Sequence, residues 1–139
     1  MRRYLLDTNI LIFMLTGKND DISLNVKRIF DVYPELYVSS VSIIELFQLF
    51  EKKKFKSKIY KTKLDLLNGI QNDFHMKIID FGTNQLIVNS KVSPIGDHND
   101  PFDYAIISHA ICNKIPLISS DHKFSDYQKH GLELVFNKR

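Results

Sequence analysis

Short apolar runs alternate along this chain with longer segments of helical spacing, and this alternation limits the possible folds more than any other feature. Strand-length apolar runs lie at 4–6, 36–38, 77–79, 116–119 and 134–136. Helical spacing or helix start signals mark 10–15, 23–33, 42–50, 59–74, 84–92, 101–113 and 123–129. Strands separated by helices pair in parallel, because each crossover returns the chain to the same edge. The pattern predicts an α/β fold with a mostly parallel sheet of about five strands.

The size and composition of the chain fit an ordinary globular protein. A length of 139 residues is enough for one domain with a substantial core, so we expect a single domain over 1–139. Lys and Arg number 19 against 16 Asp and Glu, a mild excess that permits a nucleic-acid partner without requiring one. One cysteine rules out an internal disulfide and fits a reducing, cytoplasmic setting. We find no apolar run of membrane-spanning length and expect no membrane partner.

Several acidic residues follow the predicted strands or begin the helices after them. In parallel α/β sheets, ligands bind outside the carboxyl ends of the strands, so these acids are expected at one edge. Carboxylates crowded together repel one another, and a divalent cation such as Mg²⁺ removes that repulsion by taking oxygen ligands. The acids concerned are Asp7, Glu45, Asp100, Asp103 and Asp121.

Each of these acids also has a purely structural interpretation as a helix cap. Ser42-x-x-Glu45 has the form of a capping box, which explains Glu45 without any chemistry. Asp100 before Pro101 is a typical helix start. The same explanation is open for Asp7 or Asn9, Asp103 and Asp121. Capping leaves one point unexplained, namely why all of these acids are expected at the same edge of the sheet.

Three motifs give the chain a resemblance to a known family. They are LLDTNILI at 5–12, VSSVSIIEL at 38–46, and DPFDYAIISHA at 100–110 followed by LISSD at 117–121. Together they resemble the PIN-domain nucleases, and most of all the VapC toxins of type II toxin–antitoxin pairs. The resemblance implies a three-layer α/β/α sandwich.

The resemblance also implies roles for individual residues. The catalytic acids are Asp7, Glu45, Asp103 and Asp121. Asp7 and Asp103 are the principal metal ligands, and Glu45, Asp121 and Asp100 are candidates for further ligation. Side chains that would hydrogen-bond to the carboxylates are Thr8, Asn9, Ser39 and Ser119. Two positions depart from the common pattern and affect substrate contacts, since Ser120 stands before the last acid where many members have Arg, and Tyr104 follows Asp103.

The implied reaction is endonucleolytic hydrolysis of RNA by a water that Mg²⁺ activates, with Mn²⁺ as a substitute. In-line attack would leave a 5′-phosphate and a 3′-hydroxyl. His98 and His109 lie near the acids in sequence, and we interpret them as surface or packing histidines rather than metal ligands.

A lysine-rich segment follows the Glu45 helix. It could hold an RNA backbone, because phosphate contacts supply affinity without base selection, or it could be a solvated helical face. The lysines are Lys52, Lys53, Lys54, Lys56 and Lys58. In VapC proteins a helical pair in this region binds a VapB-like antitoxin and helps to form a homodimer, and exposed apolar residues would suit such an interface. The apolar residues here are Phe47, Phe50, Phe55 and Tyr60.

Three other functions compete with a toxin nuclease. A receiver-like signalling domain needs a second acid directly after the first strand, but Thr8 follows Asp7 here. A PIN nuclease of RNA processing or turnover, without an antitoxin, is the nearest alternative. A catalytically silent PIN binding module is a third, and the complete set of acids argues against it.

Overall fold

The computed structural model describes residues 2–139, and in that part of the chain five strands form one sheet. They are β1 (Arg3–Leu6), β2 (Glu35–Ser39), β3 (Lys77–Ile79), β4 (Leu117–Ser119) and β5 (Leu134–Phe136). Their order across the sheet is β3-β2-β1-β4-β5, and all four pairings are parallel. The α/β class and the strand number predicted from the sequence are confirmed.

Helices occupy nearly all the predicted segments. The α-helices are α1 (Thr8–Leu15), α2 (Leu24–Asp31), α3 (Ser40–Glu51), α4 (Lys63–Asn68), α5 (Thr83–Asn89) and α6 (Pro101–Asn113). Shorter or tighter elements are the 3₁₀ helices η1 (Asn19–Asp21) and η3 (His122–His130), and the π-helical turn η2 (Gly69–Asp73) that continues α4. No helix within residues 2–139 is long and apolar enough to cross a membrane.

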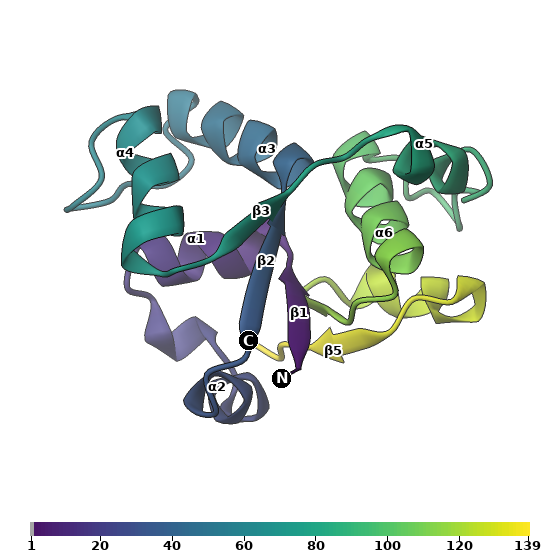
Figure 1. Cartoon of the computed structure of the whole chain (residues 1–139), viewed down its shortest axis with the longest axis horizontal. Coiled ribbons are helices and arrows are strands. Elements are labelled where there is room, and N and C mark those ends of the chain that lie inside the picture. Colours follow the sequence, from purple (N-terminus) through teal and green to yellow (C-terminus); the bar gives the residue numbers. More distant parts are fainter. Residues whose placement is uncertain (1) are drawn as a thin grey trace.

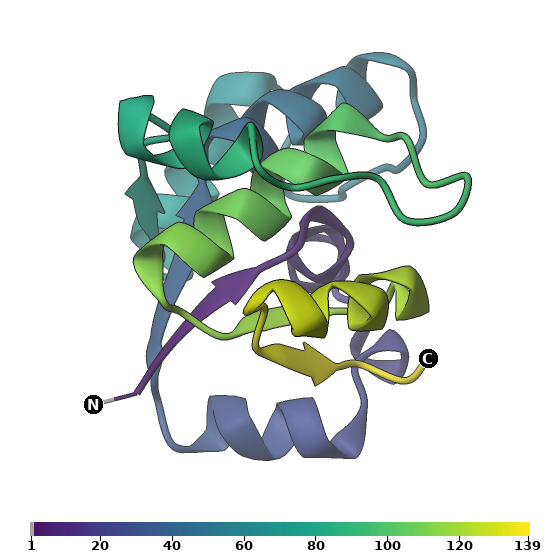
Figure 2. The same ribbon diagram turned by 90° about the vertical axis from the view of Figure 1, so that its right-hand side faces the viewer.

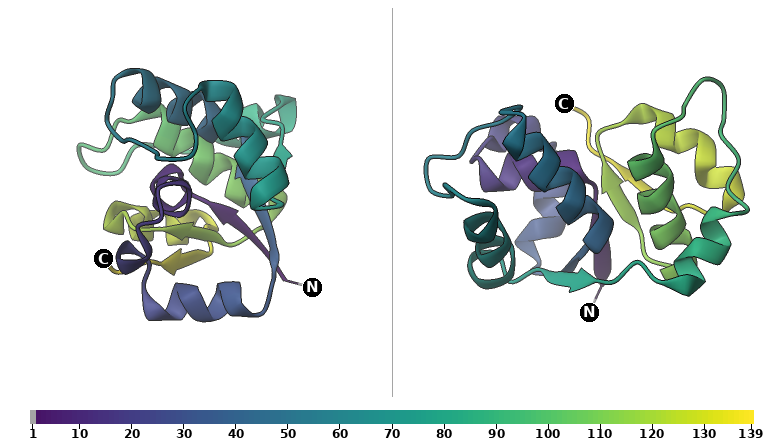
Figure 3. Two further views of the ribbon diagram at one scale, coloured as in Figure 1. Left: turned by 90° about the vertical axis from the view of Figure 1, so that its left-hand side faces the viewer. Right: turned by 90° about the horizontal axis from the view of Figure 1, so that it is seen from above.

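The sheet separates two hydrophobic cores. Figure 1 and the right-hand view of Figure 3 show α1 to α4 on one side of the sheet and α5, α6 and η3 on the other. Tyr4 and Leu6 of β1 belong to the first core, whereas Leu5 between them belongs to the second. This alternation is the period-two pattern of a strand covered on both faces. The layers are those of the expected three-layer α/β/α sandwich.

The topology brings the start of several helices to one edge. β1 is the central strand, and each parallel strand leads at its carboxyl end into a connection on that side. Asp7 follows β1 directly, and Asp121 follows β4 after a single residue. Figure 2 shows the connection between α5 and α6 extending to the side of the molecule on which α6 and η3 begin.

Two helix starts differ from the sequence prediction. α3 begins at Ser40 with Ser39 as its N-cap, so Ser42 lies inside the helix and the predicted capping box with Glu45 is wrong. The predicted helix over 59–74 begins only at Lys63, where Thr62 caps it. The cause is tertiary packing, because the buried Tyr60 ring covers Gly69 and holds the preceding residues in an irregular turn.

Candidate metal centre

Asp7, Asp100 and Asp121 each cap a helix at the edge where the strands end. Asp7 Oδ1 accepts a hydrogen bond from the Thr8 amide at 2.7 Å, at the start of α1. Asp100 accepts from the amide of Phe102, in the first turn of α6, and Asp121 caps η3 in the same way. The capping interpretation is therefore confirmed for all three, and it accounts for only part of each carboxylate's bonding capacity.

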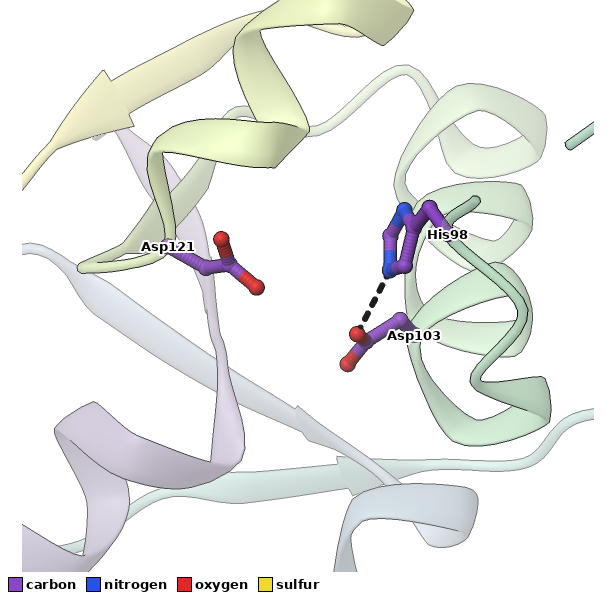
Figure 4. A group of neighbouring side chains, drawn as sticks. All are labelled: His98, Asp103 and Asp121. Atoms are coloured by element: carbon purple, nitrogen blue, oxygen red, sulfur yellow. Dashed lines mark hydrogen bonds and ion pairs between the residues drawn. The ribbon is translucent and has the colours of Figure 1, made fainter. Parts of the chain in front are cut away.

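The structure brings the acids together across four elements. Potential ligand atoms of Glu45, Asp100 and Asp103 all lie within 4.8 Å of one another. The same limit holds for a second group made of His98, Asp103 and Asp121, which Figure 4 shows converging from a loop, α6 and the start of η3. Asp103 belongs to both groups and is the centre of the cluster.

Asp7 lies beside these groups and is almost completely buried, with an exposed fraction of 4%. Its Oδ2 accepts a hydrogen bond from the Ser119 hydroxyl at 2.7 Å. The pKa of Asp7 is raised to about 7, chiefly by burial; the charges of Asp103 and Glu45 act in the same direction, and the Ser119 hydrogen bond acts against them. The ionised form of this carboxylate is therefore destabilised until a positive charge arrives.

The pKa values of Glu45 and Asp103 are raised as well. For each residue, burial is the largest cause, and the neighbouring charge of Asp100 acts in the same direction. The His98 hydrogen bond partly counters this effect on the pKa of Asp103. The pKa values of Asp7, Glu45 and Asp103 are thus all raised, and for each the causes are burial and the charge of neighbouring carboxylates.

The donor set fits a divalent cation. The cluster offers mainly carboxylate oxygens, which Mg²⁺ and Mn²⁺ prefer, and one imidazole. Burial and, to a smaller extent, the neighbouring carboxylates raise the pKa values of Asp7, Glu45 and Asp103. A bound cation would favour the ionised carboxylates against both effects.

The side chains predicted to hydrogen-bond to the carboxylates behave in different ways. Ser119 bonds to Asp7 and also accepts from the Asp121 amide at 3.0 Å, so it links two acids. Thr8 is buried, and its hydroxyl acts to lower the pKa of Glu45. The distance and angles between the two groups do not meet the criteria for a hydrogen bond.

The predictions for Asn9 and Ser39 do not match the contacts found. Asn9 is exposed to solvent. The Ser39 hydroxyl accepts from the Val41 amide and contacts Nδ1 of His109 at 2.8 Å, so its partners are not the carboxylates. The cause is the early start of α3, which makes Ser39 the helix cap.

His98 is not a surface histidine, because it is buried, and it packs against the rings of Tyr104, Phe124 and Tyr127 while it reaches the acid cluster. Its exposed fraction is 6%, and its Nε2 lies 2.8 Å from Oδ2 of Asp103. The sequence signal that could have identified it is its position just before the Asp100–Pro101 helix start, within one loop of Asp103. His109 does pack as interpreted, since it is buried beside Phe81 and burial lowers its pKa to about 4.

The lysine-rich segment lies away from the acids. All five lysines are exposed in the turn that follows α3. Two of them, Lys53 and Lys56, line a pocket of about 510 Å³ together with Phe50, Phe55 and Tyr60. Phe55 and Tyr60 are buried, so the expectation that they form an exposed apolar surface is wrong.

Comparison with known proteins identifies the family. The PIN domain profile matches residues 4–130, which is nearly the whole chain, and the chain therefore belongs to the PIN domain family. This confirms the resemblance carried by the three motifs. Comparison with curated protein sequences finds no match.

Solved structures of toxin–antitoxin complexes share the fold. A chain of VapBC2 from Rickettsia felis, bound to a promoter DNA fragment, is 22% identical with a TM-score of 0.70, and the match covers 98% of this chain and 99% of that one. DNA-bound VapBC from Salmonella typhimurium is 19% identical with a TM-score of 0.66 and 98% coverage of both chains. FitAcB from Neisseria gonorrhoeae is 17% identical with a TM-score of 0.65 and 96% coverage of both.

Proposed function

We propose that this protein is a divalent-metal-dependent endoribonuclease, which hydrolyses phosphodiester bonds in the interior of an RNA strand. The observation that carries the proposal is the convergence of Glu45, Asp100, Asp103 and Asp121 at the carboxyl edge of a parallel sheet, with Asp7 buried beside them. The elevated pKa values of Asp7, Glu45 and Asp103 support a site that takes up positive charge.

Asp103, which belongs to both groups of potential ligands, would be the principal holder of Mg²⁺ or Mn²⁺, with Glu45, Asp100 and Asp121 as further oxygen ligands. Asp7 belongs to neither group, but the charges of Asp103 and Glu45 raise its pKa, and it would take part in holding the cation from its buried position beside them. When bound, such an ion lowers the pKa of a coordinated water and neutralises charge on the scissile phosphate. Glu45 and Asp121 would orient the attacking water or complete a second metal site. Ser119 holds Asp7 in place through its 2.7 Å hydrogen bond. The products are a 5′-phosphate and a 3′-hydroxyl.

The proposal extends to a toxin restrained by a partner protein. The structural neighbours from Rickettsia felis and Salmonella typhimurium are VapBC complexes bound to DNA, which supports a VapB-like antitoxin partner for this chain. The pocket lined by Phe50, Phe55 and Lys53 at the end of α3 is a suitable place for such a contact. We further propose a homodimer as the active assembly.

The activity is tested on purified protein with labelled RNA. We expect cleavage with Mg²⁺ or Mn²⁺, none in excess EDTA, and a loss of at least about 100-fold in Asp103→Asn and Asp7→Asn, since each removes charge from the cation site. The exposed Asp31 on α2 supplies the control, and Asp31→Asn should cleave at the wild-type rate. Full cleavage by Asp103→Asn, or cleavage in EDTA, would refute the metal mechanism.

A separate experiment tests the toxin role and the two alternatives. Induced expression of the wild type should stop growth, and Asp103→Asn should not. Co-expression of a small DNA-binding protein encoded immediately upstream should restore growth. RNA cleavage without growth arrest would favour an RNA-processing nuclease, and RNA binding without cleavage would favour a silent binding module.

A further inference from the structure

A chain of hydrogen bonds connects the metal cluster to the interior of η3. His98 lies in the connection between α5 and α6, and its two ring nitrogens have different partners. Nε2 faces Oδ2 of Asp103 at 2.8 Å, and Nδ1 faces the hydroxyl of Tyr127 at 3.0 Å. Tyr127 is fully buried in η3, the element that begins at the Asp121 cap. Figure 4 shows the imidazole edge directed at Asp103.

The direction of each hydrogen bond follows from the donors available. The amide of Ile95 donates to the Tyr127 hydroxyl oxygen at 3.2 Å. The carboxylate of Asp103 can only accept a hydrogen bond, so Nε2 of His98 is the donor across the 2.8 Å between them. With that proton on Nε2, Nδ1 is able to accept the hydrogen of the Tyr127 hydroxyl at 3.0 Å.

Aromatic packing holds the imidazole ring in this orientation. The His98 ring stacks on Phe124 at a centroid distance of 6.0 Å and contacts the Tyr104 ring at 5.3 Å. The Tyr127 ring closes a third side at 5.6 Å. A ring enclosed in this way cannot rotate away from Asp103 without disturbing α6 and η3 together.

We propose that Tyr127 and His98 are positioning residues that fix Asp103 for cation binding. Tyr127 sets the Nε2–H tautomer of His98, and His98 then holds Oδ2 of Asp103 and leaves Oδ1 available to a cation. The inference rests on the proposed function, since it assigns these two residues to the same site. In this arrangement His98 acts through Asp103 and is not itself a ligand of the cation.

The tautomer is tested first, in metal-free protein, by long-range ¹H–¹⁵N NMR of the histidine rings. We expect His98 to show a protonated Nε2 and an unprotonated Nδ1, and the Tyr127→Phe variant to show a mixture of the two tautomers. Titration with Mg²⁺ should leave the Nε2 proton in place. A protonated Nδ1, or loss of the Nε2 proton on adding Mg²⁺, would show that His98 is a ligand and would overturn the proposal.

Cation affinity is tested second, by Mn²⁺ binding followed with electron paramagnetic resonance. His98→Phe keeps an aromatic ring but removes the donor, and we expect affinity to fall about 10-fold or more. His98→Gln restores an N–H donor and should recover most of that loss, which a purely structural role would not produce. The exposed His75 before β3 is the control, and His75→Gln should bind as the wild type does.

The outcomes separate this inference from the nuclease proposal. If the tautomer and the losses of Mn²⁺ affinity are as expected but the wild type does not cleave RNA, the nuclease proposal is refuted and the positioning role is supported. RNA cleavage by the wild type, together with an unchanged Mn²⁺ affinity in His98→Phe, would support the nuclease and refute the positioning role. Equal loss in His98→Gln and His98→Phe would also overturn the positioning role, because the donor would then be irrelevant.

Discussion

Individual carboxylates in this protein both cap a helix and lie in or beside the acid cluster, two roles that were alternatives at the level of the sequence. Asp7 uses Oδ1 to cap α1 and Oδ2 to receive the Ser119 hydroxyl, yet it also lies beside the acid cluster. Asp100 and Asp121 likewise cap helices while standing within ligand distance of Asp103. A carboxylate has two oxygens and about four acceptor positions, so capping does not consume its capacity to bind a cation.

The raised pKa of Asp7 predicts how stability depends on pH without metal. Its pKa rises from 3.8 to about 7 on folding, so between those values the folded state holds a proton that the unfolded state has lost. Metal-free protein should therefore become less stable as pH rises from about 4 to 7. Asp7→Asn should weaken this trend and stabilise the fold at pH 8 by about 1 to 3 kcal/mol. Thermal unfolding in EDTA measures both effects.

The control for this prediction is Asp31→Asn, at an exposed position on α2. It should follow the wild-type stability curve across the same pH range. Parallel curves for the wild type and Asp7→Asn would contradict the proposed protonation of Asp7. Residual pH dependence of the same sign is expected in Asp7→Asn, because the pKa values of Glu45 and Asp103 are raised too.

The residues that sequence reasoning missed are those whose roles depend on contacts between distant elements. Asp7, Glu45, Asp103 and Asp121 could be predicted, because each stands at a strand end or early in the helix of a recognisable motif. The position of His98 just before Asp100 was its only local signal, and its hydrogen bond with Tyr127 could not be predicted, because Tyr127 comes from η3 and no local pattern connects the two.

At the scale of elements, strands were easier to predict than helix starts. Each strand is a continuous apolar run with turn-forming residues around it, and all five lie where expected. The start of α3 was misplaced because Ser39, Ser40 and Ser42 can all cap a helix. In the structure Ser39 is the cap, since its hydroxyl accepts from the Val41 amide, and the same hydroxyl also contacts His109 on α6. Local propensity cannot choose between such neighbours.

The turn before α4 depends on a glycine, which gives a prediction at the element scale. A Cβ at Gly69 would lie 2.3 Å from Cε1 and 2.6 Å from Cζ of the Tyr60 ring. Since that ring is buried and its hydroxyl donates to Asp73 at 2.7 Å, it cannot yield easily. Gly69→Ala should destabilise the protein by about 1 to 3 kcal/mol in urea unfolding.

A double-mutant cycle checks that the Tyr60 ring is the cause. In a Tyr60→Ala background the ring is absent, so the additional cost of Gly69→Ala should nearly disappear. An equal cost of Gly69→Ala with and without the ring would show that the loss arises elsewhere in the α4–η2 helix.

Across the whole molecule, the acids and the lysines lie at different places along α3. Glu45 is in the middle of that helix, and the lysine-rich turn follows its last residue. The right-hand view of Figure 3 shows this turn on the opposite side of the molecule from the connection between α5 and α6 that carries His98. An RNA strand that contacts both the acid cluster and the lysine-rich turn must therefore extend across the protein surface between them.

Phosphate binding by this turn is tested on the non-cleaving Asp103→Asn background. Replacing Lys52, Lys53 and Lys54 by Gln should weaken RNA binding, and the slope of log affinity against log salt should fall by about 0.7 for each phosphate that a lysine no longer neutralises. The exposed Lys27 on α2 is the matched control. An unchanged slope in the triple variant would identify the turn as a solvated face, with no part in holding RNA.

The central position of β1 makes the metal cluster a late product of folding. Asp7 is bound to Ser119 of β4, and its other neighbours come from α3 and α6, so its surroundings are assembled from both ends of the sequence. Contacts between residues so far apart in the chain require closure of long loops before they contribute free energy. We therefore expect a fragment that lacks β1, α3, α6 or β4 to lack part of the site and to bind no cation there.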